Sequence, residues 1–158
     1  MHLLISSPPY FSNIPLTNTN LSEKISKKNL TLITTPFALP FSSQDGSLVY
    51  RPWDQSPLQP DGCGIPAPCG EVDLTASDLF LMLVPALAVD RHGIRLGYGG
   101  GFYDRLRARP EWCAIPALVV VQASCLSDKA LPRDAWDLPF DGWITEQGAG
   151  KSEILGSS

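Results

Sequence analysis

The sequence predicts a single α/β domain with a mostly parallel central sheet. Two uniformly apolar runs, Leu79–Val84 and Leu118–Val121, have the composition of strands that are buried on both faces. A glycine-rich loop and a helical pattern at Phe102–Ala108 stand between these two runs. This order of strand, loop, helix and strand is typical of α/β layering. The 158 residues suffice for one domain that builds its own core.

The first half of the chain predicts short elements separated by turns. A helix is expected at Leu21–Lys28, because Asn20 or Ser22 can cap its start and lysines gather near its end. Short apolar or β-branched runs predict strands, and a proline-rich stretch predicts a loop. These segments are the strands His2–Ser6, Leu30–Thr35 and Leu48–Arg51 and the loop Pro57–Gly70.

The second half predicts the elements around the sheet. Pro116–Ala123 contains the second apolar strand, Pro132–Trp136 is expected to form a short helical turn, and Gly142–Thr145 a final strand. Residues 1–150 are expected to form the domain. Residues 151–158 are expected to be a disordered tail.

Composition excludes several classes of protein. The net charge of −4 argues against a general nucleic-acid binder, which normally carries a basic excess. The longest apolar stretch, Leu79–Val89, is interrupted by Pro85 and falls short of the about 20 residues of a membrane span. The four cysteines form no C-x-x-C pair, so free thiols are expected rather than zinc or disulfides. We therefore expect a cytoplasmic protein without a membrane partner.

The strongest motif is a glycine loop between Arg95 and Asp104. Four of the five positions from 97 to 101 are glycine, and a helical pattern follows. Such a loop presents free N–H groups and the positive end of a helix, which suits a phosphate group. The dinucleotide motif G-x-G-x-x-G fails because Phe102 stands at its last glycine, and the Walker motif has no Lys-Ser/Thr here. The alternative is a surface loop that binds nothing.

These residues resemble a known family. The segment from Leu83 to Arg105, with Arg-Leu-Gly-Tyr-Gly-Gly-Gly-Phe-Tyr-Asp-Arg at 95–105, is similar to the signature of the 5-formyltetrahydrofolate cyclo-ligases, also called methenyltetrahydrofolate synthetases. Trp136–Glu146 resembles the end of these proteins, and Gly64–Pro68 resembles their proline-rich segment. The resemblance covers about residues 30–146. It implies a three-layer α/β fold like that of sugar-phosphate isomerases and CoA-transferases, whose activities remain a remoter alternative.

The resemblance also implies an activity. The family uses ATP and Mg²⁺ to convert 5-formyltetrahydrofolate to 5,10-methenyltetrahydrofolate, with release of ADP and phosphate. The formyl oxygen takes the γ-phosphoryl group, N10 attacks the activated carbon, and phosphate leaves. Such chemistry depends on positioning and charge stabilisation rather than on a protein nucleophile. A monomer that binds a small-molecule substrate is expected, with no nucleic acid as partner.

Several residues carry implied roles. Asp104 and Asp137 are expected to hold Mg²⁺, although Asp137 could instead be a turn residue, as is expected of Asp141. Tyr98, Phe102 and Tyr103 could contact the pterin or belong to the core, and Trp53 and Ile65 are expected to wall the folate pocket. Arg95 and Tyr103 are the expected catalytic residues. The expected nucleotide-binding residues are Arg95, Leu96, Gly97, Tyr98, Gly99, Gly100, Gly101, Phe102 and Tyr103.

The chain departs from the family pattern in three places. The resemblance implies an N-terminal helix whose Lys and Arg reach the ATP phosphates, and residues 1–158 are expected to begin after the position of that helix. The substrate-binding Glu of the next segment is absent from Ser12–Thr17, where Asn13 cannot carry its charge, and Ala67 replaces another Glu. The alternatives are a truncated chain, a divergent active enzyme, or a protein that binds nucleotide or folate without turnover.

Overall fold

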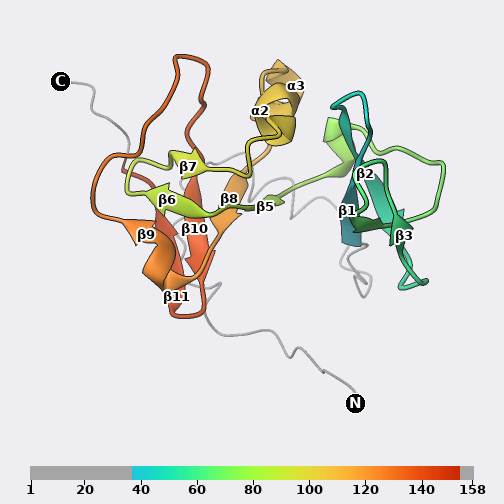
Figure 1. Ribbon diagram of the computed structural model, residues 1–158, viewed down its shortest axis with the longest axis horizontal. Coiled ribbons are helices and arrows are strands. Elements are labelled where there is room, and N and C mark those ends of the chain that lie inside the picture. Colours follow the sequence, from blue (N-terminus) through green and yellow to red (C-terminus); the bar gives the residue numbers. More distant parts are fainter. Residues whose placement is uncertain (1–36, 154–158) are drawn as a thin grey trace, which may run out of the picture. The chain divides into compact units, whose positions relative to one another are not determined.

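The computed structural model describes residues 37–153, whose helices and strands are shown in Figure 1. The chain divides into two units, residues 1–35 and 36–158. The elements expected at 2–6, 21–28 and 30–35 lie outside the described residues. In chain order the described elements are β1 (Phe37–Ser42), β2 (Leu48–Trp53), β3 (Gln59–Pro60), β4 (Pro66–Ala67), η2 (Ala76–Asp78), β5 (Met82–Pro85), β6 (Ala88–Asp90), β7 (Arg95–Leu96), α2 (Phe102–Arg107), α3 (Pro110–Cys113), β8 (Ala117–Val120), η3 (Ala123–Cys125), β9 (Leu126–Ser127), β10 (Gly142–Thr145) and β11 (Gly148–Lys151).

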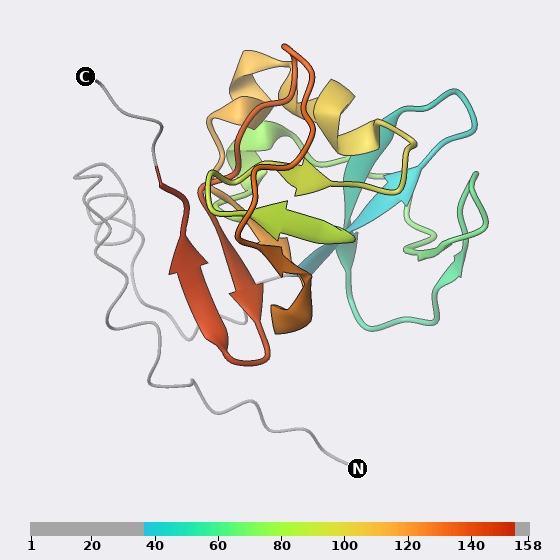
Figure 2. The same ribbon diagram turned by 60° about the vertical axis from the view of Figure 1, so that its left-hand side comes forward.

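The largest sheet has four strands in the order β11-β10-β8-β5. Strands β5 and β10 both run parallel to β8, and β11 closes one edge antiparallel to β10. In the register, Leu118 of β8 lies between Leu83 of β5 and Gly142 of β10. Figure 2 shows β10 and β11 as the red hairpin of this sheet. The predicted α/β fold is confirmed, and β10 has the predicted bounds.

One face of this sheet packs into the core. Val84 of β5 and Val119 of β8 are fully buried, in one cluster with Leu106 of α2. Their neighbours along the strands, Leu83 and Val120, are 51% and 41% exposed. Among residues 37–153, the prediction that these two strands are buried on both faces is therefore wrong. Successive side chains of a strand point to opposite faces, and within this part of the chain only one of the two faces joins the core.

A three-stranded sheet has the order β7-β6-β9, and its strand β7 leads directly into the glycine loop. The turn between β6 and β7 forms around Asp90, a carboxylate that is only 2% exposed. Its oxygens accept hydrogen bonds from the backbone amides of His92, Ile94 and Leu131 at 2.9–3.0 Å. The predicted turn at 90–93 is confirmed, and it fixes the direction in which β7 leads into the loop.

The hairpin β1–β2 is the first described element pair. Its turn contains Gly46, which has a φ of 86°, and Tyr50 of β2 pairs with Leu74 as an isolated bridge. The predicted loop at 57–70 contains the short strand pair β3–β4. That pair is tied to the end of β1 by Asp61, whose carboxylate accepts hydrogen bonds from the amides of Ser42, Cys63 and Ile65.

Helices α2 and α3 follow the loop, and α2 confirms the predicted helix to within one residue. Helix α3 begins at Pro110, whose missing N–H suits the first turn of a helix. Trp112 of α3 stacks on Tyr50 of β2, with ring centroids 6.0 Å apart. Leu106 and Trp112 thus fix both helices to the core.

Two predicted segments differ from the structure. Pro132–Trp136 forms a turn rather than a helix, because the amide of Asp137 donates to the carbonyl of Asp134 and no helical turn continues. The first residues of the expected tail are held by hydrogen bonds from the amides of Ser152 and Glu153 to the carbonyls of Asp141 and Arg91. No helix within residues 37–153 has the length and apolar composition of a membrane span.

Candidate active site

The glycine loop, residues 97–101, connects β7 to α2. Gly99 and Gly101 have φ angles of 87° and 62°, which side chains rarely adopt. The amides of Gly99, Gly100 and Gly101 donate no hydrogen bond to any other residue within the described range. The loop therefore presents free N–H groups, as predicted. Helix α2 has only six residues, so these amides and the nearby cations contribute more to anion binding than its dipole does.

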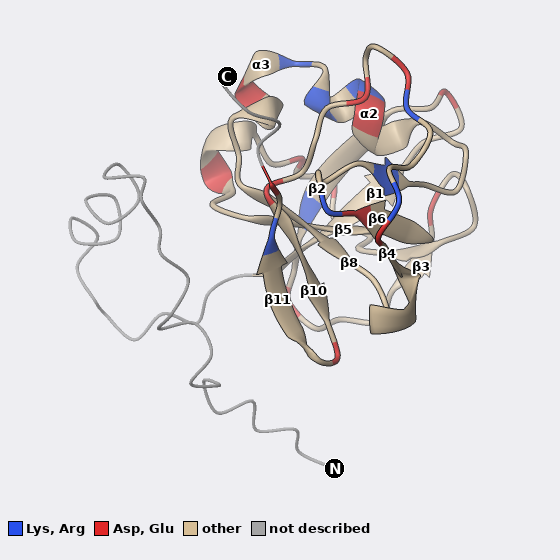
Figure 3. Cartoon of the chain, turned by 90° about the vertical axis from the view of Figure 1, so that its left-hand side faces the viewer, with Lys and Arg blue, Asp and Glu red and all other residues tan. Residues whose placement is uncertain are grey.

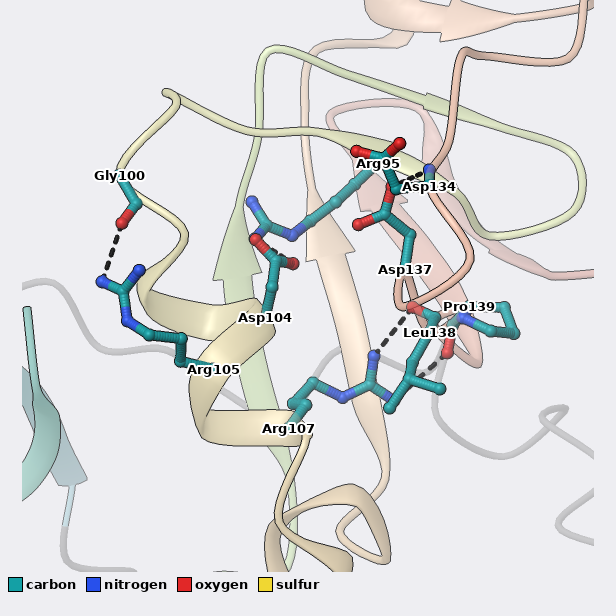
Figure 4. A network of polar contacts seen from close by, with 9 residues as sticks. All are labelled: Arg95, Gly100, Asp104, Arg105, Arg107, Asp134, Asp137, Leu138 and Pro139. Carbon is teal, nitrogen blue, oxygen red and sulfur yellow. Dashed lines mark hydrogen bonds and ion pairs between the residues drawn. The ribbon is translucent and has the colours of Figure 1, made fainter.

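Arg95 lies buried beside the loop, with a side chain that is 7% exposed. Its Nη2 donates to Oδ1 of Asp104 at 2.8 Å, and Figure 4 shows this pair. Its Nε is buried and has no hydrogen-bond partner among residues 37–153. A Cβ at Gly97 would collide with Nη1 of the same guanidinium. Gly97 thus leaves the space that the guanidinium of Arg95 occupies. Arg95 also retains N–H groups that can donate hydrogen bonds to an anion.

Two aromatic rings support this guanidinium. The Cζ atom of Arg95 lies 5.4 Å from the ring centroid of Tyr103 and 5.6 Å from that of Phe140. Such contacts between a cation and a ring face are favourable. Burial raises the pKa of Tyr103, so its hydroxyl stays protonated at neutral pH and is no base. The structure places Tyr103 against the core, with its ring beneath Arg95.

Arg105 connects the loop to the β1–β2 hairpin. Its Nε and Nη2 donate to the carbonyl of Gly46 at 3.2 and 2.8 Å, and Nη2 also donates to the carbonyl of Gly100 at 2.8 Å. Its Cζ lies 5.3 Å from the ring centroid of Phe102. The contact to Gly46 spans 59 positions of sequence. No role of Arg105 could be predicted from the sequence, because nothing in the motif indicates which distant carbonyl it reaches.

Helix α2 concentrates opposite charges. Figure 3 shows blue and red segments together on its ribbon, which carries Asp104, Arg105 and Arg107. Arg107 is 4% exposed and was also missed by the sequence analysis. The sequence offered one indication of a role for Arg107, namely that a residue three positions after Asp104 lies on the same side of a helix. The loop is therefore flanked by Arg95 and Arg105, with Asp104 between them in the sequence.

The two predicted metal ligands lie on different segments. Oδ1 of Asp104 is engaged by Arg95, and Oδ2 of Asp137 accepts the amide of Asp134 at 2.7 Å. Among the described residues, the other oxygen of each carboxylate accepts no hydrogen bond. No group of three or more His, Cys, Asp or Glu side chains within residues 37–153 could cage a metal. Asp141, which was expected to be a turn residue, accepts the amide of Ala117 with its carboxylate, a contact across 24 positions of sequence.

The remaining predicted residues surround the loop unevenly. Leu96 and Tyr98 are 48% and 75% exposed, whereas Phe102 packs against the core. The indole N–H of Trp53 donates to the carbonyl of Ser56, and Ile65 is 53% exposed. No hydrogen bond, ion pair or ring contact of the described residues joins Trp53 or Ile65 to the glycine loop. Their role in a folate pocket stays a prediction.

Comparison with known sequences gives a consistent result. The sequence model of the 5-formyltetrahydrofolate cyclo-ligase family matches residues 17–146. A 5-formyltetrahydrofolate cyclo-ligase from Haemophilus influenzae is 35% identical over 96 residues, which cover 59% of this chain and 50% of that protein. One from Escherichia coli K12 is 37% identical over 73 residues, covering 46% of this chain and 39% of that protein. The chain thus spans half or less of these relatives.

Two solved structures are similar in fold to this chain. A 5,10-methenyltetrahydrofolate synthetase from Aquifex aeolicus aligns with a TM-score of 0.58 and 26% identity over 89% of this chain and 67% of that one. A 5,10-methenyltetrahydrofolate synthetase from Mycoplasma pneumoniae aligns with a TM-score of 0.50 and 17% identity over 69% of this chain and 54% of that one. At this identity the second likeness supports the fold alone.

Proposed function

The chain belongs to the 5-formyltetrahydrofolate cyclo-ligase family, and we propose that it converts 5-formyltetrahydrofolate to 5,10-methenyltetrahydrofolate at the expense of ATP. The observation that carries this proposal is the buried Arg95, paired with Asp104 and placed beside a glycine loop whose amides at 99–101 donate to no other described residue. Because the chain spans only part of its relatives, their activity is transferred here as a proposal. The reaction belongs to one-carbon metabolism.

The residues of the loop fit a polyphosphate. Arg95 holds a buried Nε without a partner among the described residues, and Gly97 leaves the space that its guanidinium occupies. Around Gly99 a Cβ would meet no atom within 4 Å, so the backbone there is open to a ligand. When bound, ATP supplies the phosphoryl group that activates the formyl oxygen. Arg95 and the loop amides stabilise the negative charge on that group and orient it.

Asp104 and Asp137 fit a Mg²⁺ ion that is held partly by the protein and partly by the phosphates. Mg²⁺ is usually held by one or two carboxylates together with phosphate oxygens and waters rather than by a cage of protein ligands. Each of the two carboxylates keeps one oxygen without a hydrogen bond in the described structure. Bound Mg²⁺ would lower the negative charge of the phosphates. Arg95 keeps Asp104 in place for this role.

Tyr103 contributes through its ring. The ring supports Arg95, and the protonated hydroxyl does not act as a general base at neutral pH. We extend the proposal to a monomer that acts in the cytoplasm. Four free thiols suit that reducing compartment.

The test is an absorbance assay for methenyltetrahydrofolate with the purified 158-residue chain, 5-formyltetrahydrofolate, ATP and Mg²⁺. We expect product only when ATP is present. The Asp104→Asn variant should form it at least about 10-fold more slowly, because a ligand and the partner of Arg95 are both weakened. Asp128→Asn is the matched control, since Asp128 pairs with Arg91 at an exposed surface.

Each failure has a distinct meaning. A folded chain without product, whose melting temperature nevertheless rises with ATP, would replace the proposal with the alternative of a nucleotide-binding protein without turnover. A folded chain that neither turns over nor responds to ATP or 5-formyltetrahydrofolate would remove both functions.

A further inference from the structure

Arg107, at the end of α2, is a buried cation whose partners are backbone carbonyls. Its Nη1 donates to the carbonyl of Leu138 at 3.2 Å and its Nη2 to that of Pro139 at 3.1 Å, as Figure 4 shows. Its Nε is buried without a partner, and within residues 37–153 its guanidinium forms no ion pair. Burial lowers the pKa of Arg107. A buried charge without a contact ion pair is costly even with the carboxylates of Asp141 and Asp104 in its vicinity, so a merely structural role would be served better by an apolar side chain.

The shape of the guanidinium explains what an apolar residue could not do. Two adjacent N–H groups of one planar fork reach two successive carbonyls, and a lysine has no such geometry. The same group lies over Phe140, with its Cζ 4.1 Å from the ring centroid. Arg95 contacts that ring as well, at 5.6 Å. Phe140 thus links the cation of the glycine loop to Arg107.

The segment that Arg107 holds carries Asp137. Leu138 follows Asp137 directly, and Asp137 closes the preceding turn by two contacts with Asp134. Its amide donates to the carbonyl of Asp134 at 3.1 Å, and its carboxylate accepts the amide of Asp134 at 2.7 Å. Downstream, the amide of Phe140 donates to the carbonyl of Gly93 at 2.9 Å. The turn is therefore anchored immediately after Asp137 by helix α2 and by the β6–β7 turn.

Helix α2 consequently serves both proposed metal ligands. It carries Asp104 itself, and three residues later it carries Arg107, which fixes the backbone that follows Asp137. Residues three apart on a helix lie on the same face. We propose that Arg107 is a positioning residue that acts through Asp137. It would keep the carboxylates of Asp104 and Asp137 in fixed positions relative to each other. This inference rests on the proposed function, since it gives Asp137 a role in binding Mg²⁺ and ATP.

The test compares Arg107→Lys, which keeps the charge and loses the fork, with Arg109→Met as a control. Arg109 is exposed, and its one ring contact is with Trp112. We expect Arg107→Lys to raise the Mg²⁺ concentration for half-maximal rate and the KM for ATP by about 10- to 100-fold. The KM for 5-formyltetrahydrofolate should change less than about twofold. In an Asp137→Asn background the same substitution should have no further effect, because residues that act as a unit are not additive.

A second readout needs no turnover. Hydrogen exchange of the Asp134 amide, which donates to Asp137, should accelerate about tenfold in Arg107→Lys, while that of Val119 in the core stays unchanged. Unaltered exchange at Asp134, or a kinetic effect equal in both Asp137 backgrounds, would overturn the inference. If the wild type forms no product, the proposed function fails and the role of Asp137 in binding Mg²⁺ fails with it, while the exchange measurement still decides whether Arg107 holds the turn at Asp137. Arg107→Gln, which keeps a planar donor, replaces the lysine variant in both measurements if that variant does not fold.

Discussion

Arg95 is the residue around which the site is built, and Gly97 is the position that leaves space for it. Replacing Gly97 by alanine should displace the guanidinium rather than the fold, because the new Cβ meets the end of a side chain and not backbone. Loss of one charge-assisted contact corresponds to about 1.5–3 kcal/mol. We therefore expect kcat/KM for ATP to fall by about 10- to 150-fold, with a nearly unchanged melting temperature.

Gly70→Ala is the control for this change, because a Cβ at Gly70 meets nothing within 4 Å and its φ is not positive. Its steady-state kinetics should match those of the wild type. Equal losses in the two variants would show that Gly97 has no special relation to Arg95.

Tyr103 separates the contribution of a ring from that of a hydroxyl. Since its ring supports Arg95 and burial raises its pKa, Tyr103→Phe should retain activity within about threefold. Tyr103→Leu removes the ring and should lower kcat/KM by about 2- to 30-fold, given the roughly 0.5–2 kcal/mol of such contacts. A loss of activity in Tyr103→Phe as large as that in Tyr103→Leu would instead make the hydroxyl a catalytic group.

At the scale of elements, the β6–β7 turn depends on Gly93. Its φ is 80°, and a Cβ there would collide with the backbone carbonyl of Phe140. Gly64 has a φ of 79° but open space around it, so the two glycines differ only in their surroundings. We expect Gly64→Ala to lower the free energy of unfolding by about 1–2 kcal/mol, the strain of the backbone alone. Gly93→Ala should cost clearly more in urea unfolding, and equal values would contradict the contact with Phe140.

Asp61 makes the junction between β1 and β3–β4 sensitive to acid. Burial opposes its charge, but the amides of Ile65, Ser42 and Cys63 hold the pKa of Asp61 below its usual value. A lowered pKa means stability that is present above the unfolded value of about 3.9 and is lost as the pH falls below it. Asp61→Asn should lower the free energy of unfolding at pH 7 by about 1–3 kcal/mol, because the NH₂ group of the asparagine cannot accept a hydrogen bond from a backbone amide.

The pH dependence is the check on this assignment. The difference in unfolding free energy between wild type and Asp61→Asn should shrink as the pH falls from 5 to 3. A difference that stays constant over this range would show that the charge of Asp61 does not matter.

Elements with strong local signals could be predicted from the sequence. The helix at 102–107 follows glycines and has suitable charges at both ends, and the β10 strand is apolar and bounded by turn residues. The strands β3, β4, β6, β7 and β9 have two or three residues each, and their pairing partners rather than their own composition define them. The segment 132–136 was predicted as a helical turn, but in the structure it closes a single turn through contacts between Asp134 and Asp137, and no helix continues from it.

At the scale of the whole molecule, the motif at 95–105 identified the family. Arg95 and Asp104 form an ion pair beside the glycine loop, and the role of this loop in binding phosphate stays a prediction. The contacts of Arg105 with Gly46 and of Arg107 with Leu138 join segments that are 59 and 31 positions apart. Such long-range hydrogen bonds leave no periodic pattern in one sequence, so only the structure shows how the loop is held.

We propose that this chain couples phosphoryl transfer to closure of the folate ring at the glycine loop. The ratio of ADP to methenyltetrahydrofolate formed by the purified chain tests this coupling. We expect one ADP for each product molecule and no product without ATP. We also expect a parallel fall of both yields in Gly97→Ala. A folded chain that forms methenyltetrahydrofolate without ADP, or ADP without methenyltetrahydrofolate, would contradict it.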